Sequence, residues 1–304
     1  MRKILVFVFA LSLYPGLKAD AQYYYENSRY FGSDFTVEVG GSFGIMNALT
    51  DLGGRKGVGK KFIKDLNWKN SKPAAGFYLA GTYRDAIAVR VEATFGTVQA
   101  YDSILKSVKT TTYGRYERNL SFKSKITDLQ LAAEIHPLFF KSYDEDPPRI
   151  SPYGVIGVGY YSFDPRTKFN GQWYALQPLH TEGQGAEGLT GTQPYKLSQL
   201  NVAAGFGVRY ELNSIFRARL EFVHRFLNTD YLDDVSTTYV DPGVFNSMLT
   251  PSQAALAQQL FDRQGELTPG HVTDVGAQRG NPNNKDAFFT IQLKVGIVLG
   301  RQKR

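Results

Sequence analysis

The sequence predicts an all-β fold: an eight-stranded antiparallel transmembrane β-barrel with long extracellular loops and short periplasmic turns. Three observations support this prediction. Apolar and polar residues alternate in several separate segments, short and long links alternate between these segments, and one face of the segments is rich in small residues. Alternation with a period of two is typical of strands that have one face in apolar surroundings.

The alternating segments are the predicted strands. In the first of them, Phe35, Val37 and Val39 alternate with Thr36 and Glu38. An eighth strand is predicted at residues 152–163 from spacing and β-propensity, because Gly and Tyr leave no clear polar face there. The seven segments with clear alternation are residues 35–43, 75–84, 86–96, 128–136, 199–212, 215–226 and 288–299.

The links between the predicted strands fall into two classes. Those near Asp85-Ala86 and Asn213-Ser214 are tight turns, and the link at 142–148 is moderately short. The links at 45–73, 97–119, 164–197 and 227–286 are long. Outer-membrane barrels have short turns on the periplasmic side and long loops outside. The alternation of short and long links therefore favours a membrane barrel.

Small residues indicate which face of the strands points inward. The polar face carries many glycines, among them Gly40, Gly76 and Gly205. Glycine weakens a strand, and an exposed outer face has no steric need for it. The lumen of an eight-stranded barrel has that need, because side chains only just fill it. We therefore expect the polar face to line the lumen and the Phe, Leu and Val face to meet lipid.

The inward face is predicted to carry a charge network. Seven positive residues there nearly balance six negative ones. Charges away from bulk water persist when they are paired and hydrogen-bonded. This balance favours a packed plug of ion pairs over a selective ion pathway, which would favour one sign of charge and a wider barrel. The predicted network comprises Glu38, Arg84, Arg90, Glu92, Asp128, Glu134, Arg209, Glu211, Arg217, Arg219, Glu221, Arg225 and Lys294.

The first residues predict export. Arg2 and Lys3 precede a short apolar run, and the small-residue stop Ala19-Asp20-Ala21 predicts a signal peptide at 1–21 with the barrel domain at 22–304. The chain has no Cys, which excludes a lipoprotein anchor, disulfides and thiol catalysis. No later stretch is apolar enough for a transmembrane helix, so a spanning unit would have to be a barrel. We expect the protein in the outer membrane, with lipid as a partner.

Two loop segments carry a resemblance to a known family. Residues 171–185, followed by Pro194-Tyr195-Lys196-Leu197, and residues 225–241 look like loop motifs of a Bacteroidota outer-membrane barrel family that includes the PorG component of the type IX protein secretion system. The segment 77–84 is similar to the second strand of that family, and the chain adds a loop insertion at about 243–280. The motif residues are Trp173, Leu176, Gln177, Pro178, Thr181, Glu182, Gly183, Asp230, Tyr231, Leu232, Asp233, Asp234, Tyr239 and Asp241.

The resemblance implies a non-enzymatic anchor or component of a type IX-like secretion apparatus. Periplasmic or surface components of that machine are its implied partners. Two alternatives remain open: a narrow passive channel, and an outer-membrane enzyme with its site on the loops. An open lumen would favour the channel, and a convergent carboxylate or Ser/His cluster on the loop ends would favour the enzyme. No nucleic acid or nucleotide partner, cofactor or metal is predicted.

Several apparent chemical motifs fail on their context. Residues 54–61 match most of a phosphate-binding loop, but Lys61 replaces the required Ser or Thr. Gly154, Gly157 and Gly159 lie inside a predicted strand, so they do not form a dinucleotide turn. The four histidines have no metal-ligand spacing, and no nucleophile elbow marks a hydrolytic triad; His224 is expected on the lipid face.

Two loop features allow two interpretations each. Asp230, Asp233, Asp234 and Asp241 are oxygen ligands of the kind that calcium prefers. Asp also favours turns on its own account, and structural turns with arginine pairing are the favoured interpretation. Residues 251–262 read as a short amphipathic helix that either caps the barrel, which is favoured, or meets a partner.

Overall fold

The computed structural model describes residues 34–57, 65–141, 147–189 and 193–300. The predicted signal peptide lies outside these residues. Eight long strands pair in the order β3-β2-β1-β10-β9-β8-β5-β4, and a further pairing of β3 with β4 closes the sheet into a barrel. All of the pairings are antiparallel. The predicted fold class is therefore confirmed.

Each barrel strand pairs with its neighbours along the chain. The barrel closes between β1 and β10, whose register runs from Val37 opposite Leu299 to Leu49 opposite Ala287. The segment that was predicted from spacing alone is β5, and it pairs along its length with β4 and β8. The strands are β1 (Phe35–Leu49), β2 (Lys72–Tyr83), β3 (Ile87–Tyr101), β4 (Ser121–Ile135), β5 (Ile150–Ser162), β8 (Ser198–Glu211), β9 (Phe216–Leu227) and β10 (Ala287–Leu299).

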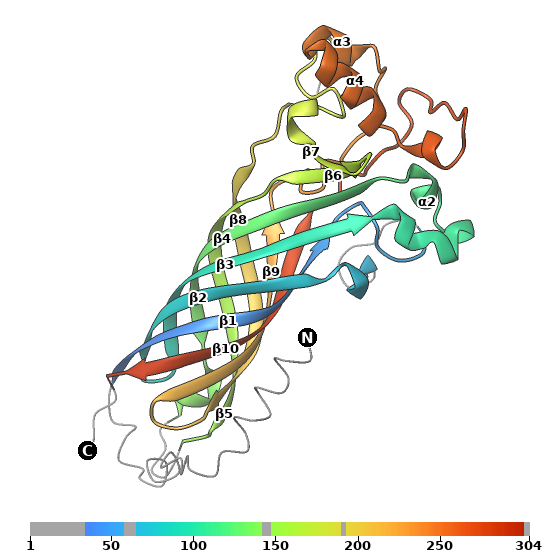
Figure 1. Cartoon of the computed structure of the whole chain (residues 1–304). Coiled ribbons are helices and arrows are strands. Elements are labelled where there is room, and N and C mark those ends of the chain that lie inside the picture. The colour runs from blue at the N-terminus through green and yellow to red at the C-terminus, as the bar shows by residue number, and fades with distance from the viewer. Residues whose placement is uncertain (1–33, 58–64, 142–146, 190–192, 301–304) are drawn as a thin grey trace.

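Short and long links lie at opposite ends of the barrel, as predicted (Figure 1). The short end holds the turns β2–β3 and β8–β9 and the link β4–β5 with the 3-10 helix η6 (Pro137–Phe140). Several strands extend further into the loop end than predicted. Residues 97–101, expected in a loop, are the last residues of β3, and they pair with the first residues of β4. The barrel therefore projects above the predicted strand ends.

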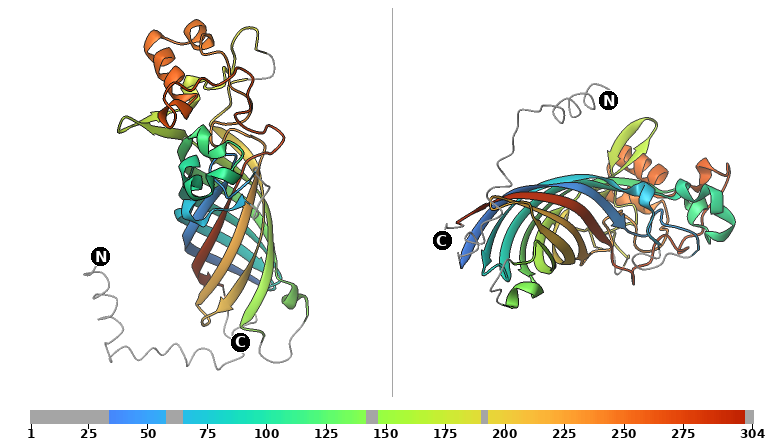
Figure 2. Two further views of the ribbon diagram at one scale, coloured as in Figure 1. Left: turned by 90° about the vertical axis from the view of Figure 1, so that its right-hand side faces the viewer. Right: turned by 90° about the horizontal axis from the view of Figure 1, so that it is seen from below.

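The long loops contain secondary structure of their own (Figure 2). The predicted helix at 251–262 is α4 (Pro251–Leu260). Its N-cap residue, Thr250, forms a capping box with Gln253. The link between β5 and β8 forms a hairpin that was not predicted, and this hairpin extends the sheet at β4. The other loop elements are η4 (Trp68–Asn70), η5 (Asp102–Thr111), α2 (Arg115–Arg118), β6 (Pro165–Phe169), β7 (Gln172–Ala175), η7 (Gln177–Leu179), α3 (Val244–Met248) and η8 (Gln264–Glu266).

The outer wall of the barrel is apolar and exposed. Phe43, Phe77 and Leu220 expose 67%, 61% and 58% of their surfaces, while their polar neighbours along each strand are buried. The barrel is therefore polar inside and apolar outside, which is the arrangement found in membrane barrels. No helix in the described part of the chain is long and apolar enough to cross a membrane.

Glycines on the inward face make room for large side chains. A Cβ atom on Gly207 would lie 2.6 Å from Cζ of Tyr153, and one on Gly40 would lie 2.6 Å from Cζ of Tyr78. Both distances are far inside van der Waals contact. The inward positions therefore require glycine for the predicted steric reason, because a larger residue would clash inside the lumen.

Candidate functional site

The lower half of the lumen holds a buried network of paired charges, here called the lumen charge network. Its acidic and basic side chains come from β1, β3, β4, β8, β9 and β10 and from the β2–β3 turn, and nearly all are at most 2% exposed. Its members are Glu38, Asp85, Arg90, Glu92, Asp128, Glu134, Arg209, Glu211, Arg217, Arg219, Glu221, Arg225 and Lys294.

Arg219 lies at the centre of the network. Its Nη1 donates to Oε2 of Glu134 at 2.6 Å, and its Nη2 donates to Oε2 of Glu38 at 2.5 Å. Glu134 also accepts from Arg90. Two nitrogens of Arg90 donate to Glu221 at 2.7 and 3.0 Å. One arginine thus joins strands that lie on different sides of the lumen.

The network extends in both directions along the barrel axis. On the loop side, the Lys294 ammonium bridges Glu92 at 2.5 Å and Glu221 at 2.7 Å. On the turn side, Arg217 contacts Glu38 at 3.0 Å and Glu211 at 2.6 Å. Further members complete the two ends: Asp85 pairs with Arg209 and Arg217, and Arg225 pairs with Asp128.

Arg84 was predicted in this network, and that prediction is wrong. Strand β2 ends at Tyr83, and Arg84 begins the turn with φ of 48°. Its side chain is 63% exposed and pairs with Asp34 outside the lumen. The alternation of faces does not continue into a turn. The next residue, Asp85, reaches back into the lumen instead.

Three aromatic side chains that contact the lumen charge network were not predicted from the sequence. The hydroxyl of Tyr78 donates to Glu38 at 2.5 Å, and that of Tyr153 donates to Glu221 at 2.7 Å. His136 stacks on Tyr153 with ring centroids 4.9 Å apart and contacts Glu134. The two tyrosines have the inward parity of their strands, which could have identified them. A tyrosine, however, suits a lipid-facing girdle equally well.

The charges of the network nearly cancel. Six basic side chains face seven acidic ones once Arg84 is removed and Asp85 is added. Removal of water from a charge costs several kcal/mol, and good pairing geometry is needed to offset that cost. The short contacts supply that geometry. The arrangement is therefore a packed plug of ion pairs, the favoured one of the two predicted interpretations.

The upper lumen is apolar and continues into the loops. Met46, Phe122 and Phe288 point into the barrel and are at most 3% exposed. They belong to one hydrophobic cluster with loop residues such as Leu232 and Phe245. We call the loop part of this cluster the cap; its buried members are Leu52, Leu120, Phe163, Leu176, Leu179, Tyr195, Leu232, Val235, Tyr239, Val240, Phe245, Ala254, Ala257, Leu260 and Phe261. Since α4 contributes Leu260 to the cap, the structure matches the predicted capping role of this helix.

The two family-like loop motifs meet inside the cap. Glu182 of the first motif accepts hydrogen bonds from the backbone N–H groups of Ser236 and Thr237 at 2.9 and 3.0 Å. It also accepts from the hydroxyl of Tyr231 at 3.2 Å and pairs with Arg279 at 2.8 Å. The carboxylate of Glu182 thereby joins both motifs to the insertion at 243–280.

A second contact between the motifs involves Asp234. Its carboxylate accepts from the hydroxyls of Thr181 and Tyr195, each at 2.6 Å. The ring of Tyr195 stacks on that of Tyr231 with centroids 4.9 Å apart. Leu176, Leu232 and Tyr239 are buried in the cap, Gln177 binds the carbonyl of Tyr195, and Gly183 has φ of 68°.

Three motif residues lie away from these contacts. Trp173 is 48% exposed, with the Lys123 ammonium 5.4 Å from its ring centroid. Pro178 is exposed in η7. Asp241 is exposed and accepts from the backbone N–H of Gly243 at 2.8 Å, which is a local turn.

Four acidic side chains gather beneath the cap, and we call them the acidic cluster: Asp51, Asp230, Asp233 and Asp286. Burial raises the pKa of Asp230 to about 8 and that of Asp51 to about 6, and the acidic neighbours contribute to the same upward shift. Burial likewise raises the pKa of Asp233 and Asp286 well above the usual range. Each of these carboxyl groups therefore keeps its proton to a higher pH than an ordinary aspartate does.

The acidic cluster has structural contacts of its own. Backbone N–H groups of Leu52 and Val235 donate to Asp233, and that of Leu232 donates to Asp286. The predicted structural role of the Asp-rich loop is thus visible. The predicted arginine pairing is not, because among the described residues the ion pairs of the cap use Glu182, Asp102 and Asp65 instead. Within the described ranges, no three acidic or histidine side chains are arranged to hold a metal ion.

The remaining motifs are accounted for by the fold. Part of the phosphate-loop-like segment 54–61 lies outside the described residues. Gly154, Gly157 and Gly159 are in β5, as predicted. His224 projects from β9 with the parity of the outer wall, where its ring contacts Phe226 with centroids 4.3 Å apart.

Fold and lumen together define the class: a closed eight-stranded β-barrel with a charge-filled lumen. No protein-family description and no curated protein matches the chain. Solved structures of outer-membrane barrels are similar over 87% of this chain. They include OprG from Pseudomonas aeruginosa (13% identity, 95% of that chain, TM-score 0.37), Ail of Yersinia pestis in complex with sucrose octasulfate (9%, 97%, 0.35) and Neisserial surface protein A (6%, 97%, 0.35). These values are too low to add to what the strand pairing itself establishes.

Proposed function

We propose that this chain is a non-enzymatic barrel of the outer membrane that holds partner proteins of a type IX-like secretion apparatus. The membrane part of the proposal rests on the apolar outer wall, which would be unstable in water. The secretion part rests on the resemblance of the two loop motifs. The observation that carries the proposal is the filled lumen, because a barrel without a passage can act only by binding partners at its two ends.

The lumen offers no route for a protein substrate. Paired charges fill its lower half, and apolar side chains fill its upper half. A solute would have to break several buried ion pairs in sequence, and the loss of one partner of such a pair typically costs about 3–5 kcal/mol. The same closure disfavours the passive channel. It also disfavours a loop-borne enzyme, since Asp230, Asp233 and Asp286 are at most 3% exposed.

Two surfaces are available for partners. At the turn end, η6 presents Leu138 and Phe140, which are 38% and 63% exposed. At the loop end, the insertion presents Val272 and Val275, which are 84% and 65% exposed. A periplasmic ring would attach at the turn end, and a surface component at the loop end. The buried hydrogen bonds of Glu182 and Asp234 hold the loops at this surface in one conformation.

The test is crosslinking and purification from native membranes. Phe140→Asp and Val272→Asp place a charge on each surface without touching the lumen or cap. We expect a defined set of secretion components to co-purify with the wild-type barrel, and one of the two variants to lose it. Deletion of the gene is expected to block export of secreted cargo while small-solute uptake is unchanged. An intact set of secreted proteins after deletion, with no co-purifying partner, would overturn the proposal.

A further inference from the structure

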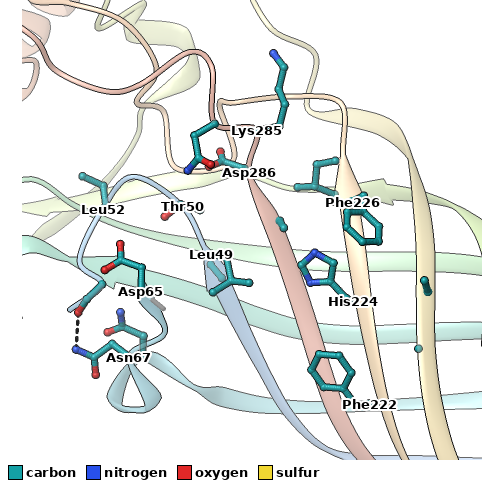
Figure 3. A pocket seen from close by; sticks show the side chains of 18 of the residues that line it. Leu49, Thr50, Leu52, Asp65, Asn67, Phe222, His224, Phe226, Lys285 and Asp286 are labelled. Carbon is teal, nitrogen blue, oxygen red and sulfur yellow. Dashed lines mark hydrogen bonds between the residues drawn. The ribbon is translucent and has the colours of Figure 1, made fainter. Parts of the chain in front are cut away.

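A groove runs along the outer wall between the barrel and the first long loop. Its central part has a volume of about 650 Å³ and is lined by the outward side chains Phe222, His224 and Phe226 on one side and by Asp65 and Asn67 on the other. Figure 3 shows the strands and the loop facing one another across this space. The groove is outside the lumen, so the plug and cap do not account for it.

The first loop forms one side of the groove because it folds onto the outside of the barrel. Asn47 has the outward parity of β1 but is fully buried. Its side-chain amide donates to the carbonyl of Asn67 at 3.0 Å and to the Ser71 hydroxyl at 2.8 Å. Trp68 then packs on outward Phe289 with ring centroids 6.1 Å apart. A polar residue on the apolar wall thus anchors the loop.

The lower end of the groove is apolar. A smaller pocket of about 250 Å³ shares Leu49, Phe206 and Phe222 with the central part and adds Leu66 and Trp68. The rings of Phe206, Phe222 and Phe289 form a row with centroid distances of 5.4 and 5.5 Å. Phe206 is 66% exposed toward the lipid side. Aromatic rows of this kind mark the boundary between hydrocarbon and head groups.

The loop side of the groove is cationic. A third pocket of about 620 Å³ shares Gly54 and Asn67 with the central part and is lined by Arg55, Lys56 and Lys69. Lys285 adds a fourth cation above the central part (Figure 3). All four side chains are exposed, and none forms an ion pair with a described residue.

The acidic residues of the groove do not offset these cations. Asp65 is bound to Arg115 at 2.8 Å. Asp286 is 1% exposed and accepts from the backbone of Leu232. The groove therefore combines an apolar end on the barrel wall with unpaired positive charge on the loops that border it.

We propose that this groove seats a phosphate-bearing lipid of the outer leaflet, with acyl chain against Phe206, Phe222 and Trp68 and phosphate near Lys56, Lys69 and Lys285. The apolar end faces lipid in any membrane barrel, and the exposed cations of the loops that border the groove select an anionic head group. A lysine near a membrane surface contributes about 1 kcal/mol to binding of an anionic lipid.

Native mass spectrometry of the mature chain in detergent tests the proposal. The probes are dioleoyl phosphatidic acid and dioleoyl phosphatidylcholine, which share acyl chains and differ in head-group charge. Phosphatidic acid is expected to be retained more strongly. Each of Lys56→Gln, Lys69→Gln and Lys285→Gln is expected to weaken that retention about fivefold, which is the factor for about 1 kcal/mol. Phe206→Ala is expected to weaken the retention of both lipids.

The matched control is Lys125→Gln. Lys125 is exposed with outward parity on β4, on the opposite side of the barrel, and its loss should leave retention unchanged. Heat-modified migration on a gel verifies that each variant is folded. Equal retention of the two lipids, or equal losses from Lys125→Gln and Lys69→Gln, would overturn the proposal. So would displacement of the lipid by inorganic phosphate, which would indicate a site for a soluble anion.

Discussion

Glu182 and Arg279 form a buried ion pair of 2.8 Å between two loops that are 97 residues apart in the chain. Arg279 also donates to the carbonyl oxygens of Asp234 and Phe261. The pair therefore fastens the first loop motif, the second motif and the end of α4 at one point. The four long loops at this end of the barrel therefore pack together as a single cap and do not fold independently of one another.

Removal of Glu182 should open the cap. Glu182→Ala leaves Arg279 buried without its partner, a change that typically costs about 3–5 kcal/mol. We expect the loops of this variant to be cleaved by protease much faster than those of the wild type, while the barrel itself stays resistant. Glu187→Ala, an exposed acid in the same loop, is the control. Equal protection of both variants would show that the cap does not depend on this contact.

Arg219 should be important for the stability of the lumen. Arg219→Leu leaves Glu38 and Glu134 each short of one partner, so we expect a loss of about 3–5 kcal/mol in the free energy of unfolding, measured by urea titration in detergent. Arg84→Leu removes an exposed pair that water screens, and it should leave the unfolding curve nearly unchanged. If the two variants unfold alike, the lumen charges are individually hydrated and the plug is wet.

Two glycines of β1 provide a steric comparison. A Cβ on inward Gly44 would lie 2.0 Å from the carbonyl oxygen of Ile291, whereas one on outward Gly41 would lie 3.7 Å from that of Gly76. Because backbone has to move in the first case, Gly44→Ala should destabilise the barrel by about 1–3 kcal/mol. Gly41→Ala should change the unfolding midpoint little. The reverse order would mean that the faces are assigned the wrong way round.

The stability of the cap should fall as the pH rises from about 5 to about 8. The folded pKa values of Asp51 and Asp230, about 6 and about 8, lie above the unfolded value of about 3.9. The folded state therefore holds more protons in this range, and stability decreases as the pH rises through it. The rate at which a protease cleaves the loops, measured across this pH range, follows cap opening.

Asp230→Asn should flatten this pH dependence, because the amide needs no proton to be neutral. Asp241→Asn, in the same loop but exposed, should leave the dependence as it is. A cap that becomes more stable between pH 5 and 8 would contradict the assignment of protonated carboxyl groups beneath it.

The barrel was largely predictable from the sequence because its information is local. Parity along a strand assigns each side chain to lipid or lumen, and link lengths assign each strand end to a side. The rule failed at Arg84, where the chain left the strand one residue earlier than the pattern indicated. It also gave no warning that inward residues near the loops, such as Met46 and Phe288, are apolar. They are apolar because the cap, and not water, covers them.

The contacts of the cap could not be predicted in the same way. Glu182, Asp234 and Arg279 are brought together by loops of irregular conformation, so no period in the sequence relates them. The resemblance to a family marked two of the three segments as special without indicating that they touch. The acidic cluster shows the same limitation, because Asp51 and Asp286 come from the first and last long loops.

The central claim is that the lumen is closed, so that the barrel acts through its surfaces. Single-channel recording of the purified mature protein in a planar bilayer tests this claim most directly. We predict no steady conductance from the wild type, and openings only when the plug is disrupted, for example by Arg219→Ala combined with Arg90→Ala. A steady conductance through the wild-type protein would contradict the account and identify a pore.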